Sequence, residues 1–172
     1  MDRSYYADHA LTIARHPSET DERMMLRVLA FALHAGPTCA FGRGLSTDDE
    51  PDLWQRDLTG AIALWIDVGQ PDEKLVRRAC GRARRGRRLH VRSRRGHVVG
   101  PRQGSLERAR NLRGDERAGS RHGLDLASLA QRTMELQCTI QEGHVWLGSK
   151  RQRRWRSRST TWRAPPARVR AA

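Results

Sequence analysis

The sequence predicts a single α/β domain, and three observations lead to this prediction. The chain has 172 residues, a length typical of one domain. Residues 19–35 have the apolar spacing of a helix, and residues 61–83 look like a buried strand followed directly by a second helix. The sequence contains no run of 18 apolar residues, so we expect no membrane span and no membrane partner.

The first helix is predicted over residues 19–35 because apolar side chains recur three and four residues apart. This apolar stripe consists of Met25, Val28, Leu29 and Ala32. Ser18 is the expected N-cap, with Asp21 three residues later, and Gly36 followed by Pro37 is a stop signal. A shorter helix is expected before it, over residues 8–16.

Residues 61–83 are predicted to form a strand followed by a helix. Residues 61–69 alternate between two mostly apolar faces, which predicts a strand buried on both sides. Pro71 suits the start of a helix over 71–83, with acidic residues in its first turn and arginines later. Residues 124–134 are expected to be helical, and residues 135–149 are expected to form a β-hairpin that turns at 142–143.

Charge divides the chain into four blocks. Residues 1–81 carry a net charge of −4 and residues 124–149 carry −2, whereas residues 82–123 carry +11 and residues 150–172 carry +9. The arginine-rich segments 84–123 and 150–172 are expected to be irregular or disordered parts of the single domain 1–172. The net charge of +14 alone favours a polyanionic partner such as nucleic acid.

Three interpretations of the arginine run at 84–100 stay open. It is an arm that neutralises phosphates, a solvated loop, or the product of a shifted reading frame. In G+C-rich DNA a one-base shift turns many codons into arginine codons, and one encoding of this run reads as GEVVVYTYGRGGATWW in the next frame. A parallel sheet would place a strand at this point, directly after the helix at 71–83. The DNA sequence of the locus distinguishes the third interpretation from the others.

Several segments together resemble the YaeQ family of bacterial proteins. They are LTIARHPSETDERMMLRVLAFALHA, FGRGLSTDDEPDLW, LWIDVGQPDEKLVRRACGRA, RTMELQCTIQEGHVWL and TTWRAPP. The resemblance covers about residues 5–83, 124–149 and 160–166. The resemblance implies that members of the family usually begin with an extra strand ahead of the position of Met1, which we expect this chain to lack, and that they carry strands where this chain has arginine runs.

The resemblance implies a variant of the PD-(D/E)XK nuclease core, with a mixed sheet flanked by helices. In that core a helix supplies a glutamate, and a following sheet supplies an aspartate and then a (D/E)-x-K element. The order here fits with a helix at 19–35, an acidic turn at 48–52 and a strand that ends at Asp67. The lysine is missing, since Gly69 occupies its place and Gln70 follows.

These carboxylates suggest a divalent-metal site. Phosphodiester hydrolysis needs a Lewis acid and an activated water, and Mg²⁺ takes carboxylate oxygens. We therefore expect Asp67, Glu22 and one of Asp49 or Asp52 to bind Mg²⁺. Asp67, Glu22 and Gln70 are the candidate catalytic residues.

Each candidate also has an ordinary structural explanation. Asp67 can cap the helix that starts near residue 71, Glu22 can be a solvated first-turn acid, and residues 48–52 can be an exposed turn. Trp54 and Trp65 are expected in the core rather than as platforms for bases.

Three functional hypotheses follow. The first is a cytoplasmic, magnesium-dependent, nuclease-like protein that acts on nucleic acid. The second is a non-catalytic interaction or regulatory protein that binds a protein partner, and the third is a damaged copy without function. The cytoplasm is expected because there is no apolar signal segment and because Cys39, Cys80 and Cys138 have no CxxC spacing, which suggests buried free thiols.

Overall fold

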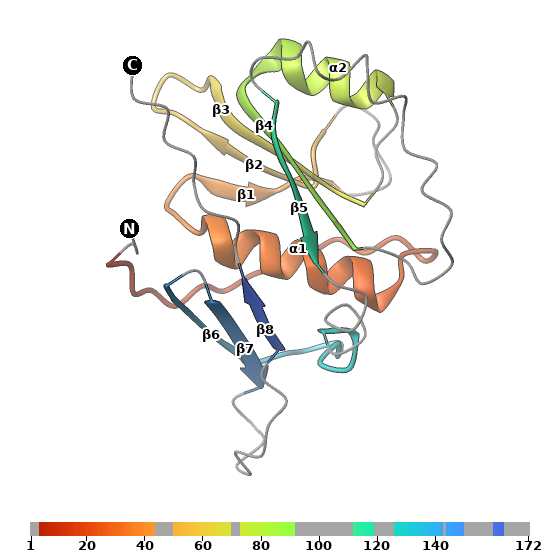
Figure 1. Ribbon diagram of the computed structural model, residues 1–172, viewed down its shortest axis with the longest axis vertical. Helices are drawn as coiled ribbons and strands as arrows, with labels where there is room; N and C mark the ends of the chain where they lie inside the picture. The colour runs from red at the N-terminus through yellow and green to blue at the C-terminus, as the bar shows by residue number, and fades with distance from the viewer. Residues whose placement is uncertain are drawn as a thin grey trace.

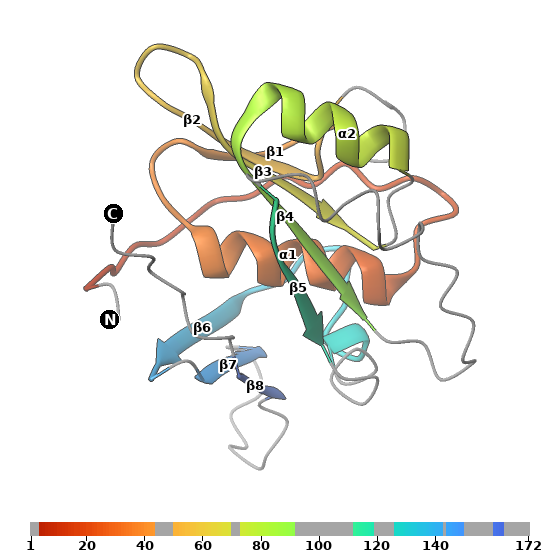
Figure 2. The same cartoon turned by 45° about the horizontal axis from the view of Figure 1, so that its top comes forward.

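One long helix, α1, is enclosed between two β-sheets (Figures 1 and 2). The computed structural model describes residues 4–43, 50–69, 73–91, 112–118, 126–142, 144–149 and 160–163. The elements are α1 (Asp21–His34), β1 (Cys39–Phe41), β2 (Leu53–Arg56), β3 (Ile62–Val68), α2 (Glu73–Arg82), β4 (Ala83–Val91), β5 (Leu112–Ala118), β6 (Leu136–Gln141), β7 (His144–Ser149) and β8 (Thr160–Arg163).

The larger sheet is mixed. Its strand order is β1-β2-β3-β4-β5, with antiparallel pairs from β1 to β3 and parallel pairs from β3 to β5. The smaller sheet is antiparallel, in the order β6-β7-β8. Since α1 and α2 lie on opposite faces of the larger sheet (Figure 1), the predicted α/β domain with a mixed sheet flanked by helices is confirmed. Its assignment as a variant of the nuclease core stays a prediction.

Helix α1 is buried around most of its circumference. Eight consecutive residues, 24–31, are buried, and they include Arg27. A helix with a sheet on each side has no broad solvent face, so this burial follows from its position. The helix begins at Asp21 with Thr20 as the N-cap, whose hydroxyl accepts a hydrogen bond from Arg23 N at 3.2 Å. The expectation of Ser18 as N-cap is wrong, because its hydroxyl is instead 2.7 Å from His16 Nδ1.

The two faces of β3 pack against different helices. Leu64, Ile66 and Val68 join the core cluster of α1, whereas Trp65 clusters with Ala79 and Ala83. The predicted alternation therefore holds along most of the strand. A bulge between β2 and β3 shifts the register at Gln55 and Arg56, and Ile62 consequently packs with the Trp65 cluster.

The hairpin between β2 and β3 is closed by the carboxylate of Asp57. Its Oδ1 accepts hydrogen bonds from Thr59 Oγ1 at 2.6 Å, Thr59 N at 2.9 Å and Ala61 N at 3.0 Å. Arg84 Nη2 lies 3.3 Å from Oδ2. The hydrogen bond from the Thr59 hydroxyl is the main cause of a lowered pKa for Asp57, and the two amides and Arg84 contribute.

The lowered pKa of Asp57 predicts a pH-dependent contribution to stability. The native state binds a proton at this carboxylate less readily than the unfolded chain, so its contribution is present above the unfolded pKa of 3.8. It is lost as the pH falls through the lower folded pKa. We expect wild type to exceed Asp57→Asn in free energy of unfolding at pH 7 and the difference to disappear in acid. Urea titrations across this range test it, and a pH-independent difference would contradict it.

The arginine-rich segments contain regular strands where irregular structure was expected. Residues 83–91 form β4 between β3 and β5, and strands also form over 112–118 and 160–163. The expectation is wrong for these stretches, because a parallel ladder is made by backbone groups and the β3–α2 unit leads directly into it. The remainder of 84–123 and 150–172 lies outside the described residues.

The remaining local predictions have mixed outcomes. The hairpin at 135–149 is confirmed as β6 and β7, with Glu142 at a positive φ of 50° in the turn. Residues 8–16 are not helical, and the expected helix at 124–134 is reduced to a turn at 126–129 among its described residues. The described cysteines form no disulfide with one another, but the expected burial of their thiols is wrong, because Cys138 is exposed and Cys39 and Cys80 are only half-buried. Among the described residues, no helix is long and apolar enough to cross a membrane.

Candidate functional site

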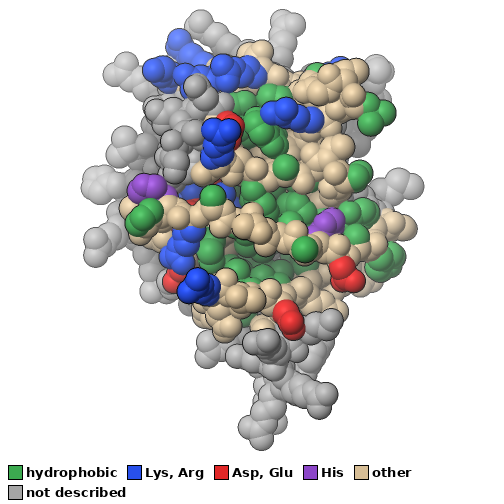
Figure 3. Space-filling view, turned by 180° about the vertical axis from the view of Figure 1, so that it is seen from behind, with side chains coloured by type: hydrophobic (Ala, Val, Ile, Leu, Met, Phe, Trp, Pro, Cys, Tyr) green, Lys and Arg blue, Asp and Glu red, His purple; other side chains and the backbone are tan. Residues whose placement is uncertain are grey.

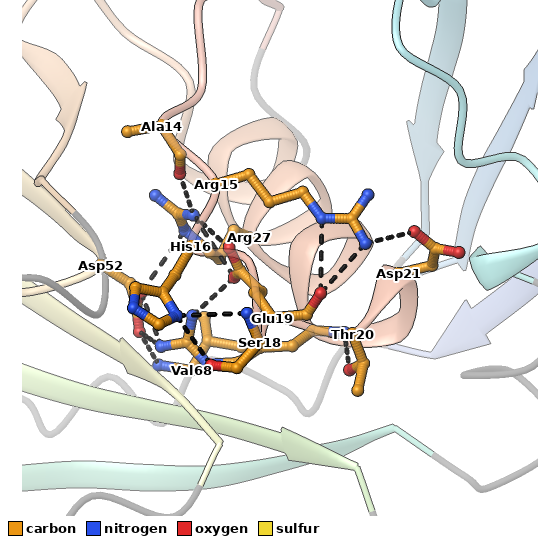
Figure 4. Close-up of polar contacts among 11 residues, drawn as sticks. Ala14, Arg15, His16, Ser18, Glu19, Thr20, Asp21, Arg27, Asp52 and Val68 are labelled. Carbon is orange, nitrogen blue, oxygen red and sulfur yellow. Dashed lines mark hydrogen bonds and ion pairs between the residues drawn. The ribbon is translucent and has the colours of Figure 1, made fainter.

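A buried network of two acids and two arginines joins the start of α1 to the larger sheet (Figure 4). Glu19, in the turn before α1, accepts a hydrogen bond from Arg23 Nη1 at 2.6 Å and from Arg27 Nη1 at 3.1 and 3.3 Å. Arg23 Nη2 lies 2.8 Å from both carboxylate oxygens of Asp52, which directly precedes β2. We call these four residues the ion network.

The carboxylate of Asp52 is fully engaged by donors. Besides Arg23, it accepts a hydrogen bond from Val68 N at 2.8 Å, and Arg27 Nε lies 3.4 Å from its Oδ1. Asp52 therefore ties the end of β3 to α1. Burial raises the pKa of Asp52 above its ordinary value, while the charge of Arg23, the Val68 amide and Arg27 oppose that rise.

Arg27 is the most deeply buried charge of the ion network. Its side chain and that of Glu19 are both 0% exposed. Its Nη1 also donates to the carbonyl of Ala14 at 2.8 Å, which fixes the segment before α1. Among the described residues, its Nε and Nη2 make no hydrogen bond, although Nε is within ion-pair distance of Asp52, and its guanidinium carbon lies 5.6 Å from the ring centroid of Phe41. A cation that lies over an aromatic face is attracted to the ring, and this attraction offsets part of the hydration that the guanidinium loses on burial.

Of the predicted site residues that the structure describes, Asp67 is not brought together with Glu22 and Asp52. Asp67 follows Trp65 by two residues on the α2 side of β3, and its carboxylate accepts the Trp65 indole N–H at 3.1 Å. Glu22 and Asp52 belong to the opposite side, where α1 lies, so β3 separates Asp67 from both. Asp49 and Gln70 lie outside the described residues. Among the described residues, no group of three or more His, Cys, Asp or Glu side chains is placed to hold a metal ion.

Sequence reasoning missed three of the four members of the ion network. Glu19, Arg23 and Arg27 follow one another at intervals of four residues, the spacing that stacks side chains on one helical face. Arg27 also falls between Leu26 and Val28, inside the apolar segment. A charge at such a position signals a buried ion pair, and this signal was available in the sequence.

Comparison with known proteins identifies the family. The family model described as "YaeQ protein" matches residues 1–155. The chain belongs to the YaeQ family. It is 40% identical to the "Uncharacterized protein YaeQ" of Salmonella typhi and 38% identical to that of Escherichia coli K12, over 96% of this chain and 91% of each relative.

Two solved YaeQ structures share the fold. The crystal structure of the protein from Xanthomonas axonopodis pv. citri has a TM-score of 0.73 and 43% identity, over 96% of this chain and 93% of that one. The structure from Pseudomonas syringae has a TM-score of 0.76 and 35% identity, over 86% and 81%. The names of these YaeQ relatives state no reaction, so the function of this chain has to be argued from its own residues.

Proposed function

We propose that this YaeQ-family chain binds nucleic acid without hydrolysing it. The observation that carries the non-catalytic part of this proposal is the engagement of Asp52 by Arg23, Arg27 and the Val68 amide. A magnesium ion needs carboxylate oxygens at about 2.0–2.1 Å. At Asp52 such an ion would have to displace these donors and lie beside two guanidinium groups. The arrangement therefore favours a structural role for Asp52 and a non-catalytic function for the chain.

The charge of α2 supports a polyanionic partner. Figure 3 shows basic side chains gathered at the top of the molecule, over α2. The exposed members of this basic surface are Lys74, Arg77 and Arg82 on α2 and Arg84 at the start of β4. Rows of lysine and arginine bind phosphates and release counterions, which makes affinity fall as salt rises. Nucleic acid is a polyanion with regularly spaced phosphates, so several of these basic side chains can bind phosphates of one strand at the same time.

A binding and cleavage assay tests the proposal. Fluorescence anisotropy with labelled DNA and RNA of about 16 nucleotides, enough for one single-strand site, should show saturable binding that weakens steeply with salt. Lys74→Glu/Arg77→Glu should lower the affinity about tenfold or more and flatten the salt dependence, because phosphate contacts are lost. The matched control is Arg43→Glu/Arg132→Glu, which changes the net charge equally at exposed positions off α2.

The same samples test hydrolysis. Incubation with Mg²⁺ should leave every oligonucleotide as intact as incubation with a chelator. Magnesium-dependent cleavage would contradict the non-catalytic part of the proposal. No binding by wild type at low salt, or equal losses in the two charge variants, would contradict the nucleic-acid part and favour a protein partner.

A further inference from the structure

On the face of the larger sheet that packs against α2, side chains become more exposed to solvent from β3 to β1. Trp65 on β3 pairs across the sheet with Trp54 on β2, which in turn pairs with Ala40 on β1. Residues paired in this way share one face of the sheet. Trp65 is buried beside α2 residue Ala79, Trp54 is only half-buried, and Ala40 is exposed. Trp54 therefore lies at the edge of the area that α2 covers.

An arginine lies over the ring of this tryptophan. The guanidinium carbon of Arg56 is 4.1 Å from the ring centroid of Trp54, and Arg56 is exposed. The two residues are two positions apart on β2, so they project on the same face. Attraction to the indole ring restrains the guanidinium, and because Arg56 is exposed, a further flat ligand can reach it from solvent.

We propose that Trp54 and Arg56 form a stacking platform for the bases of a single-stranded nucleic acid. This inference rests on the proposed nucleic-acid function and adds the strand type and the contact that selects it. Unpaired bases stack on aromatic rings and on arginine planes, while a basic surface alongside binds their phosphates. Here α2 supplies the basic surface on the same side of the sheet.

The platform favours single strands over duplexes because only unpaired bases expose their flat faces. The acid nearest in sequence, Asp57, does not oppose this, since its carboxylate is bound by Thr59 and by Arg84 at 3.3 Å. The tryptophan was expected in the core. Its half-buried position and its arginine partner distinguish it from Trp65, which fits that expectation.

The decisive variant is Arg56→Lys, which keeps the charge but loses the planar stacking surface. Binding is measured by anisotropy with a single-stranded oligothymidine, with an abasic strand of the same length, and with a duplex. We expect Arg56→Lys to weaken binding of the oligothymidine about tenfold, the order of one base-stacking contact. Binding of the abasic strand and the duplex should not change, because the phosphate contacts remain.

A second variant tests the platform without changing Arg56, so that a local disturbance caused by the introduced lysine can be recognised. Trp54→Phe keeps an aromatic ring but offers Arg56 a smaller surface to stack on. It should weaken binding of the oligothymidine and leave binding of the abasic strand and the duplex unchanged. If Arg56→Lys binds the oligothymidine like wild type, or if the abasic strand binds as tightly as the oligothymidine, the platform is refuted. If the α2 charge variant still weakens binding in that case, the proposed function survives without the platform. If wild type binds no nucleic acid, both fail.

Discussion

Replacing Asp52 with asparagine is expected to lower the free energy of unfolding by about 3–5 kcal/mol, the cost of breaking a buried ion pair from one side. The substitution keeps the shape of the side chain but leaves Arg23 and Arg27 with one anionic partner, Glu19, within the ion network. Such a loss is a large share of the roughly 5–15 kcal/mol that stabilises a domain. Urea unfolding followed by circular dichroism measures it.

The matched control for Asp52 is Asp21→Asn. Asp21 pairs with Arg15 at 2.8 Å, but these side chains are 52% and 44% exposed. An exposed pair contributes about 0–1 kcal/mol, so this variant should unfold close to wild type. Equal effects of the two substitutions would show that the charge of Asp52 does not hold the domain together.

Arg27→Met is expected to be similarly costly, because it removes the cation from the most buried pair of the ion network. Glu19 would keep Arg23 as its remaining partner in the network, and the carbonyl of Ala14 would lose the hydrogen bond from Arg27. We expect a loss of about 3–5 kcal/mol by the same measurement, although methionine preserves much of the apolar stem.

A double-mutant cycle separates the ion pair from packing. Once Glu19→Gln has removed the buried anion, Arg27→Met should cost less, and the two substitutions should fall short of additivity by about 1–3 kcal/mol. Methionine and glutamine together leave no uncompensated charge between them. Strictly additive losses would mean that Arg27 acts through packing alone, and the ion network would then be incidental.

The periodicity of apolar residues was sufficient to predict the elements that have a regular apolar pattern. Helix α1, strand β3 and the β6–β7 hairpin lie within one or two residues of their predicted bounds. Strand β2 was missed because its four residues are too short for alternation to be visible, and β4 because a backbone ladder overrides its arginine composition.

The candidate site was less accessible to sequence reasoning because it depends on distant contacts. Arg23 meets Asp52 across 29 positions of chain, and only the docking of β2 on α1 brings them together. The alternation along β3 puts Asp67 and Ile66 on different faces of the strand. Which face α1 would cover could not be read from that pattern, and this decided that Asp67 lies away from Glu22 and Asp52.

Isothermal titration of the folded chain with Mg²⁺ tests the central claim, that Asp52 is a structural ion partner and that Asp52 and Asp67 do not form a common metal site. The account predicts no saturable heat at millimolar Mg²⁺, and the same flat profile for wild type and Asp67→Asn. Stoichiometric binding that Asp67→Asn abolishes would contradict it, because it would require Asp67 to serve a metal site that the separation by β3 does not provide.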